Sequence, residues 1–198
     1  MKELKVRITF TEEILGTASN DPEIHDEYIA SKAPDAPSRE EEVAALGVNE
    51  VIEKSMTVFP RTPSGKPFLY DYQMKGFFKD SCGMLARLKG ESESSKLKAY
   101  KKIIDGLVFV EPRMIPFEFE GKIGTCQRPL RAQTAQGERI ALANSETIPA
   151  GAHVDLTIIT LDPAHEAAVR EWLDYGKLRG IGQWRNSGKG RFIWEEIV

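Results

Sequence analysis

The segment from residue 179 to residue 191 combines the residue types that can hold a phosphate chain. Its two Gly-x-Gly pairs, Gly180 with Gly182 and Gly188 with Gly190, permit positive φ and close backbone approach, so N–H groups could face phosphate oxygens. Four cations and one aromatic ring could meet phosphates and a base: Arg179, Trp184, Arg185, Lys189 and Arg191. Because the segment follows an expected helix, it fits neither the dinucleotide nor the P-loop fingerprint. Spacing alone predicts either a phosphate-binding loop or a flexible connector.

Basic side chains elsewhere could extend such a loop into a groove. Lys75 and Lys79 lie on an expected helix, and Arg128 and Arg131 flank an expected strand. The two arginines could reach the same groove or pair with neighbouring carboxylates, and both interpretations stay open. The lysine-rich run over 96–102 is more typical of a solvated helix face.

The residue types that build metal and nucleophile sites are sparse. Cys82 and Cys126 lie far apart without CxxC spacing, which argues against a zinc site and suits a reducing compartment. His153 begins an expected strand and His165 lies in a first helical turn, so we expect both to be structural or exposed. His25 lies in a variable loop. No Ser/His/Asp order and no metal-ligand cluster stand out, and we expect no cofactor.

The charge is unevenly distributed along the 198 residues. The formal net charge is −3, yet residues 1–60 hold 6 basic and 13 acidic residues, whereas residues 61–198 hold 21 basic and 17 acidic residues. A basic surface on the second part is therefore possible. No stretch is long and apolar enough for a signal peptide or a membrane span, so we expect a cytoplasmic protein without a membrane partner.

Apolar periodicity predicts the elements that would position these residues. Lys5, Arg7 and Thr9 alternate with apolar residues, as in a half-buried strand, and apolar residues at three- and four-residue spacing predict a helix from about Tyr72 to Leu88. The further expected elements are a basic helix over 94–104, strands over 107–110, 114–119, 128–134, 139–143 and 154–161, a turn over 145–151, a helix over 162–176 and a strand over 191–198. The order is that of an α+β, ferredoxin-like (RRM-like) β-α-β-β-α-β core.

An acidic, proline-rich stretch interrupts this core after the first strand. We interpret residues 22–59 as an insertion within a single domain over 1–198, with a capping box at Ser38 that opens a short helix through Lys54.

Four segments in this order resemble the RAMP superfamily of CRISPR-associated proteins, above all the backbone subunits that line guide RNA in effector complexes. Besides the glycine-rich loop over 179–191, they are the first strand and its following glycine over 5–16, the Pro-aromatic and Lys-Gly stretch over 65–79, and the Pro-x-Gly turn over 146–151. The resemblance implies a modified RRM-like domain that contacts single-stranded RNA mainly through its backbone. It also implies other CRISPR-type subunits, or copies of the chain itself, as partners.

The chain departs from the family pattern at two places. Residues 70–73 read Tyr-Asp-Tyr-Gln where family members commonly have a Gly-Ser-Ser-like segment, and the acidic insertion is atypical. Some relatives cleave RNA with an aspartate in the loop after the first strand, where this chain has Asp21 and Asp26. A relative that processes guide RNA would use histidine, for which His25 is the candidate.

Three functions follow as hypotheses. The leading one is a noncatalytic, RAMP-like single-stranded RNA-binding protein in antiviral defense, either a CRISPR-type backbone subunit or a stand-alone relative. The second is a metal-dependent or metal-independent endoribonuclease that uses Asp21, His25 and Asp26. The third is a phage-type decoy whose acidic segment occupies a basic groove on a CRISPR complex.

Overall fold

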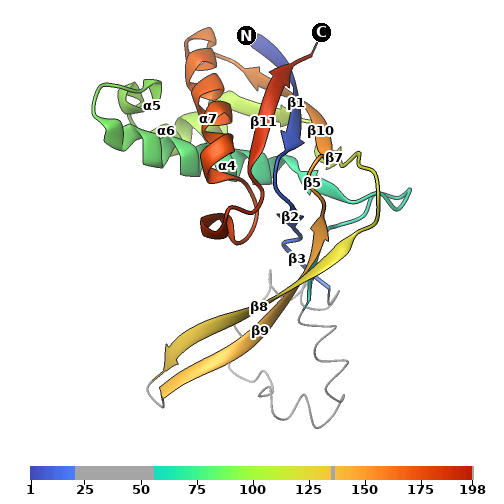
Figure 1. Ribbon diagram of the computed structural model, residues 1–198. Coiled ribbons are helices and arrows are strands. Elements are labelled where there is room, and N and C mark those ends of the chain that lie inside the picture. Colours follow the sequence, from blue (N-terminus) through green and yellow to red (C-terminus); the bar gives the residue numbers. More distant parts are fainter. Residues whose placement is uncertain (21–55, 135–136, 198) are drawn as a thin grey trace, which may run out of the picture. The chain divides into compact units, whose positions relative to one another are not determined.

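The computed structural model describes residues 1–20, 56–134 and 137–197 of the chain (Figure 1). The expected helix from Ser38 through Lys54 and most of the acidic insertion over 22–59 lie outside these residues. The chain divides into two compact units, one formed by residues 1–14, 60–122 and 148–198 and the other by residues 15–59 and 123–147.

A four-stranded antiparallel sheet forms the centre of the first unit. Its strands are β1 (Lys2–Phe10), β6 (Val108–Glu111), β10 (His153–Thr160) and β11 (Phe192–Glu196). They lie side by side in the order β11-β1-β10-β6, so the first and third strands in the chain are central and the fourth and second are the edges. The alternation that predicts the first strand is confirmed, since Leu4, Val6, Ile8 and Phe10 are all buried.

The helices of this unit are α4 (Asp71–Leu85), η1 (Ala86–Leu88), α5 (Glu93–Lys96), α6 (Tyr100–Leu107), η2 (Pro163–His165) and α7 (Glu166–Arg179). The two long ones, α4 and α7, contribute the aromatic part of the core. The ring of Phe77 lies 5.2 Å from that of Phe192, and the ring of Phe78 lies 5.5 Å from that of Trp172. Strand β5 (Phe68–Tyr70) directly precedes α4, and strand β7 (Met114–Pro116) follows β6. The two strands pair with each other in a small antiparallel sheet.

The basic helix expected over 94–104 is wrong as a single element. The structure has two short helices, α5 and α6, because Ala99 adopts a left-handed conformation with φ 52°. The helix expected to end at Gly176 instead continues to Arg179. A side chain at position 176 would overlap the ring of Phe192, so Gly176 is a close-packing position rather than a helix terminator.

Two large apolar side chains lie at the margin of the core. Leu88, the last residue of the expected helix, is 51% exposed, because the α-helix ends at Leu85 and a 3-10 turn rotates residue 88 out of the apolar stripe. Trp194 is half-buried and donates its indole N–H to Asp174 at 2.9 Å.

The second unit is built around a long antiparallel hairpin of β8 (Gly124–Thr134) and β9 (Gly137–Ile148). The short strands β2 (Ile14–Leu15), β3 (Ala18–Ser19) and β4 (Thr57–Val58) complete its sheet in the order β2-β9-β4-β3. Residues 145–148, expected in a turn, belong to β9, and the turn is confined to the following residues, where Gly151 has φ 88°.

The chain is therefore α+β, as the sequence predicts. Among the described residues, no helix is both long enough and apolar enough to cross a membrane.

Candidate nucleic-acid interface

The glycine-rich loop is closed at its base by its outermost glycines. Gly180 follows the last turn of α7 with φ 72°, and the N–H of Ile181 donates to the carbonyl of Gly190 at 2.9 Å. A Cβ atom at Gly180 would lie 2.6 Å from the carbonyl oxygen of Lys189, and one at Gly190 would overlap the carbonyl of Ile181. The outer glycines are therefore required for the two chain segments to pack together.

The tip of the loop is a short 3-10 turn, η3 (Arg185–Ser187), which begins and ends in left-handed conformations. Gly188, with φ 87°, ends it, and a Cβ there would meet nothing closer than 3.6 Å. Trp184, with φ 55°, begins it in a region that is unfavourable for a bulky side chain. The side chain of Trp184 is 41% exposed, so it presents an aromatic face at the tip.

Asp80 of α4 ties two of the predicted RNA-binding cations to the helix. Its Oδ2 accepts from Nε of Arg179 at 2.9 Å and from a terminal nitrogen of Arg185 at 2.7 Å. Partial burial opposes ionisation of Asp80, but the hydrogen bonds and charges of the two arginines outweigh it, so the pKa of this carboxyl lies below its usual value. Arg179 also donates to Asn186 in η3 at 3.1 Å, which fixes the loop tip against the helix end.

The far side of the loop is held by the segment that follows β1. Lys189 forms an ion pair with Glu13, and the N–H of Gly190 donates to the carbonyl of Glu13 at 2.9 Å. The carbonyl of Arg191 in turn accepts from the N–H of Thr11 at 2.9 Å. The side chain of Arg191 is exposed and forms no ion pair with any residue that the structure describes.

The loop keeps a positive excess despite these pairs. Three of the four cations over 179–191 pair with two described carboxylates, those of Asp80 and Glu13. The guanidinium of Arg185 has five N–H donors, and one of them is used by Asp80. Arg185 and Arg191 thus keep more of their N–H donors for a ligand than Arg179 and Lys189 do.

Three of the other cations named from the sequence, Lys75, Lys79 and Arg128, already have hydrogen-bond or ion-pair partners. Lys79 forms an ion pair with Asp105 at 2.6 Å, and Lys75 donates to the backbone carbonyl of Asp105 at 3.0 Å. Arg128, in β8, is 6% exposed and donates to Ser145 Oγ at 3.1 Å, and Arg131 pairs with Ile140 in the hairpin register. RNA contact by these four residues stays a prediction.

The residues named for catalysis, Asp21, His25 and Asp26, lie outside the described residues, and their role stays a prediction. In the part of the chain that the structure describes, no group of three or more His, Cys, Asp and Glu side chains could hold a metal ion. His153 begins β10, and His165 is 9% exposed within η2.

The described strands present no row of aromatic side chains on the sheet face that is opposite α4 and α7. On the central strands it presents Lys5, Arg7, Asp155 and Thr157, and Arg7 pairs with both carboxylate oxygens of Asp155 at 2.8 and 2.7 Å. RRM domains stack bases on aromatic residues of such strands. A groove on this face is lined by Lys5, Asp155 and Thr157 among other described residues, and the one aromatic residue in its lining is Phe109, on the edge strand β6. The geometry thus favours the glycine-rich loop over the sheet face.

Comparison with known proteins gives a likeness of fold. The chain matches no family model and no curated protein sequence. It is similar to a chain in the cryo-EM structure of the Type III-B Cmr-beta bound to cognate target RNA, with a TM-score of 0.52 and 11% sequence identity. The match covers 100% of this chain and 60% of that one, so this chain spans less than two thirds of its relative. The likeness shown is one of fold alone.

Proposed function

We propose that this chain is a noncatalytic single-stranded RNA-binding module, which acts as a CRISPR-type backbone subunit or as a stand-alone relative. The observation that carries the proposal is the glycine-rich loop. It is closed at its base by Gly180 and Gly190, fixed to α4 through Asp80, and exposes an aromatic face at Trp184 and a cation at Arg191. A fixed loop of this composition suits a flexible single strand better than a rigid duplex.

The topology of the first unit supports a ferredoxin-like, RRM-like core. Its four strands are connected through α4 and α7 and lie in the spatial order fourth, first, third, second (Figure 1). That is the order expected for the β-α-β-β-α-β arrangement. The matched chain comes from an assembly bound to target RNA, which supports RNA as the ligand class here.

The loop would bind RNA by stacking and by a few directed contacts rather than by a large positive field. Trp184 would stack on one base, because every base has a π-face and such stacking is tolerant of sequence. Arg185 and Arg191 would hold adjacent phosphates, Arg185 with the donors that Asp80 leaves unused. Asp80 keeps Arg185 in place before RNA binds, which lowers the ordering cost of that contact.

A pair of aromatic substitutions tests the loop against the sheet face. Trp184 and Phe109 are 41% and 40% exposed, so Trp184→Ala and Phe109→Ala remove similar exposed rings from the two candidate surfaces. Loss of one stacked base is worth about 1–3 kcal/mol, or roughly a 5- to 150-fold weaker affinity. We expect this loss in Trp184→Ala and little change in Phe109→Ala, measured by fluorescence anisotropy with labelled single-stranded RNA. The reverse pattern would contradict the proposal.

A second pair tests the phosphate contact. Arg191→Ala removes an exposed arginine from the loop, and Arg113→Ala removes an exposed arginine that directly precedes β7 as a matched control. Each phosphate contact with a single strand contributes about 0.7 to the slope of log K against log salt concentration. Arg191→Ala should flatten that slope by about this amount, whereas Arg113→Ala should leave it unchanged. Equal slopes of log K against log salt concentration in the two variants would show that Arg191 does not contact a phosphate.

A further inference from the structure

The segment from Arg87 to Lys102, which we call the basic lobe, carries six basic and two acidic residues. It comprises the end of η1, the helix α5 and the start of α6. Lys96 pairs with Glu93 at 2.6 Å. The other five basic side chains are exposed and form no ion pair with the residues that the structure describes; they are Arg87, Lys89, Lys98, Lys101 and Lys102.

This pattern is the opposite of that on the neighbouring elements. On α4 and in the glycine-rich loop, Lys79 has Asp105, Arg185 has Asp80 and Lys189 has Glu13 as an ion-pair partner. Folding therefore uses most of the positive charge there. On the basic lobe folding leaves the positive charge available, which raises the local potential for an anionic partner.

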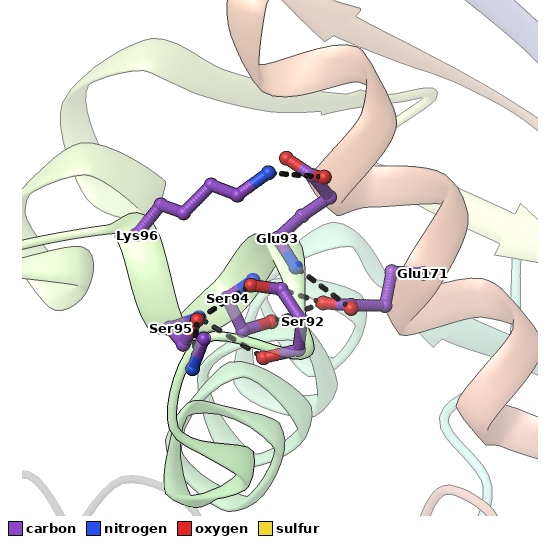
Figure 2. Close-up of polar contacts among 7 residues, drawn as sticks. Ser92, Glu93, Ser94, Ser95, Lys96 and Glu171 are labelled. Carbon is purple, nitrogen blue, oxygen red and sulfur yellow. Dashed lines mark hydrogen bonds and ion pairs between the residues drawn. The ribbon is translucent and has the colours of Figure 1, made fainter.

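A buried hydrogen-bond network holds the basic lobe to α7. The carboxylate of Glu171 accepts from the backbone N–H of Glu93 at 2.9 Å, from the N–H of Ser94 at 3.0 Å and from the hydroxyl of Ser94 at 2.6 Å (Figure 2). The indole N–H of Trp172 donates to the same hydroxyl at 2.9 Å, and both Ser94 and Trp172 are fully buried. The lobe is thus anchored through its backbone.

The same network explains why the lysines lack partners. Glu171 is the carboxylate that α7 brings to the lobe, and its oxygens are directed at N–H and O–H donors of α5 (Figure 2). Inside the lobe, Ser95 is tied to Ser92 by two hydrogen bonds of 3.1 and 2.6 Å, and the hydroxyl of Ser92 donates to the carbonyl of Leu85 at 2.9 Å. A fixed backbone therefore presents cations that are not neutralised. The backbone that carries them is already ordered before a ligand binds, which lowers the ordering cost of binding.

We infer that the basic lobe is a second nucleic-acid contact, which binds the phosphate backbone without reading sequence. This inference rests on the proposed function and extends it to a longer strand. Tyr100 is half-buried, with its hydroxyl against Gly83, so it offers no open face for a base, and the exposed side chains are chiefly cations. Asp80 anchors the glycine-rich loop and Arg87 begins the lobe seven residues later, about 10 Å of helix rise. A single RNA strand can therefore contact both the glycine-rich loop and the basic lobe.

The test compares two triple variants of the full-length chain. Lys98→Ala, Lys101→Ala and Lys102→Ala together remove three charges from the basic lobe. Lys5→Ala, Arg113→Ala and Lys122→Ala remove three exposed charges elsewhere and keep the net charge matched. Each protein is titrated with single-stranded RNA of about 6 and about 24 nucleotides, which bracket the footprint of a small single-strand-binding domain.

We expect the lobe variant to bind the short RNA like wild type and to bind the long RNA more weakly. Its salt slope for the long RNA should be shallower by about 2, from three contacts of about 0.7 each. Identical RNA affinities and salt slopes of the two triple variants overturn the inference. They leave the proposed function intact, provided that Trp184→Ala still binds the short RNA more weakly than wild type does. Wild type that binds neither RNA overturns both. If the lobe variant keeps its RNA affinity but loses binding of poly-L-glutamate, the lobe serves an acidic protein instead and the inference is wrong.

Discussion

Replacement of Asp80 by asparagine gives the sharpest test of how the glycine-rich loop is held. The carboxylate receives three donors, Arg179 Nε at 2.9 Å, Arg185 at 2.7 Å and a second Arg179 nitrogen at 3.5 Å, and its side chain is 27% exposed. Hydrogen bonds between charged groups contribute about 1.5–3 kcal/mol each when buried, and partial exposure reduces that. We expect Asp80→Asn to lower the free energy of unfolding by about 2 kcal/mol, which corresponds to a Tm fall of roughly 4–8 °C in a chain of this size.

The pH dependence of this difference has a definite sign. The pKa of Asp80 is lower in the folded protein than in the unfolded chain, so its stabilisation is fully present above the unfolded value of about 4. It is lost as the pH falls through the folded pKa, because the arginines then face a neutral carboxyl. The Tm gap between wild type and Asp80→Asn should therefore be largest at neutral pH and shrink below about pH 4.

Differential scanning calorimetry from neutral to acid pH measures both the fall in Tm and its dependence on pH. Asp105→Asn serves as the control, because Asp105 also pairs with a cation, Lys79, but its side chain is 57% exposed. It should shift Tm less than Asp80→Asn does at neutral pH. Equal Tm values for wild type and Asp80→Asn at neutral pH, or a gap that persists unchanged in acid, would refute the role assigned to Asp80.

Other substitutions probe the loop base, an open helix face and the lobe anchor. Gly190→Ala should lower stability by more than about 2 kcal/mol in urea titrations, because the new methyl group overlaps the Ile181 carbonyl at a positive φ. Gly76→Ala meets nothing within 4 Å in the middle of α4 and should instead raise stability by about 0.5–1 kcal/mol; a loss there would show that this helix face is covered. Glu171→Gln places an amide against N–H donors and should cost about 1.5–3 kcal/mol, whereas an unchanged urea midpoint would mean that the Ser94 network adds nothing.

Secondary structure could be predicted from the sequence where one face of an element is buried and the other is exposed to solvent. Alternation over β1 and the apolar stripe of α4 are of this kind, and both were predicted close to their observed bounds. The errors fall where a distant residue decides the outcome. Gly176 reads as a helix end from the sequence, but it lies inside α7 because the ring of Phe192 packs on it. The break at Ala99 carries no glycine or proline signal.

The site was predictable in composition but not in its electrostatics. The glycines, Trp184 and Arg191 are near each other in the sequence, so their pattern could be recognised locally. Asp80 lies 99 residues from Arg179, and Glu13 lies 176 residues from Lys189. No local pattern indicates that these carboxylates neutralise part of the loop's charge, and fewer of its cations are therefore left for a ligand than a count of its basic residues implies.

The central claim is that the glycine-rich loop binds single-stranded RNA, and its most direct test is the affinity of Trp184→Ala relative to wild type. Anisotropy titrations at fixed salt, with a labelled single strand and with the corresponding duplex, give the comparison. We expect that wild type prefers the single strand and that Trp184→Ala weakens this binding by roughly 5- to 150-fold. Wild-type affinity in the variant, or equal affinity of wild type for the duplex, would contradict it.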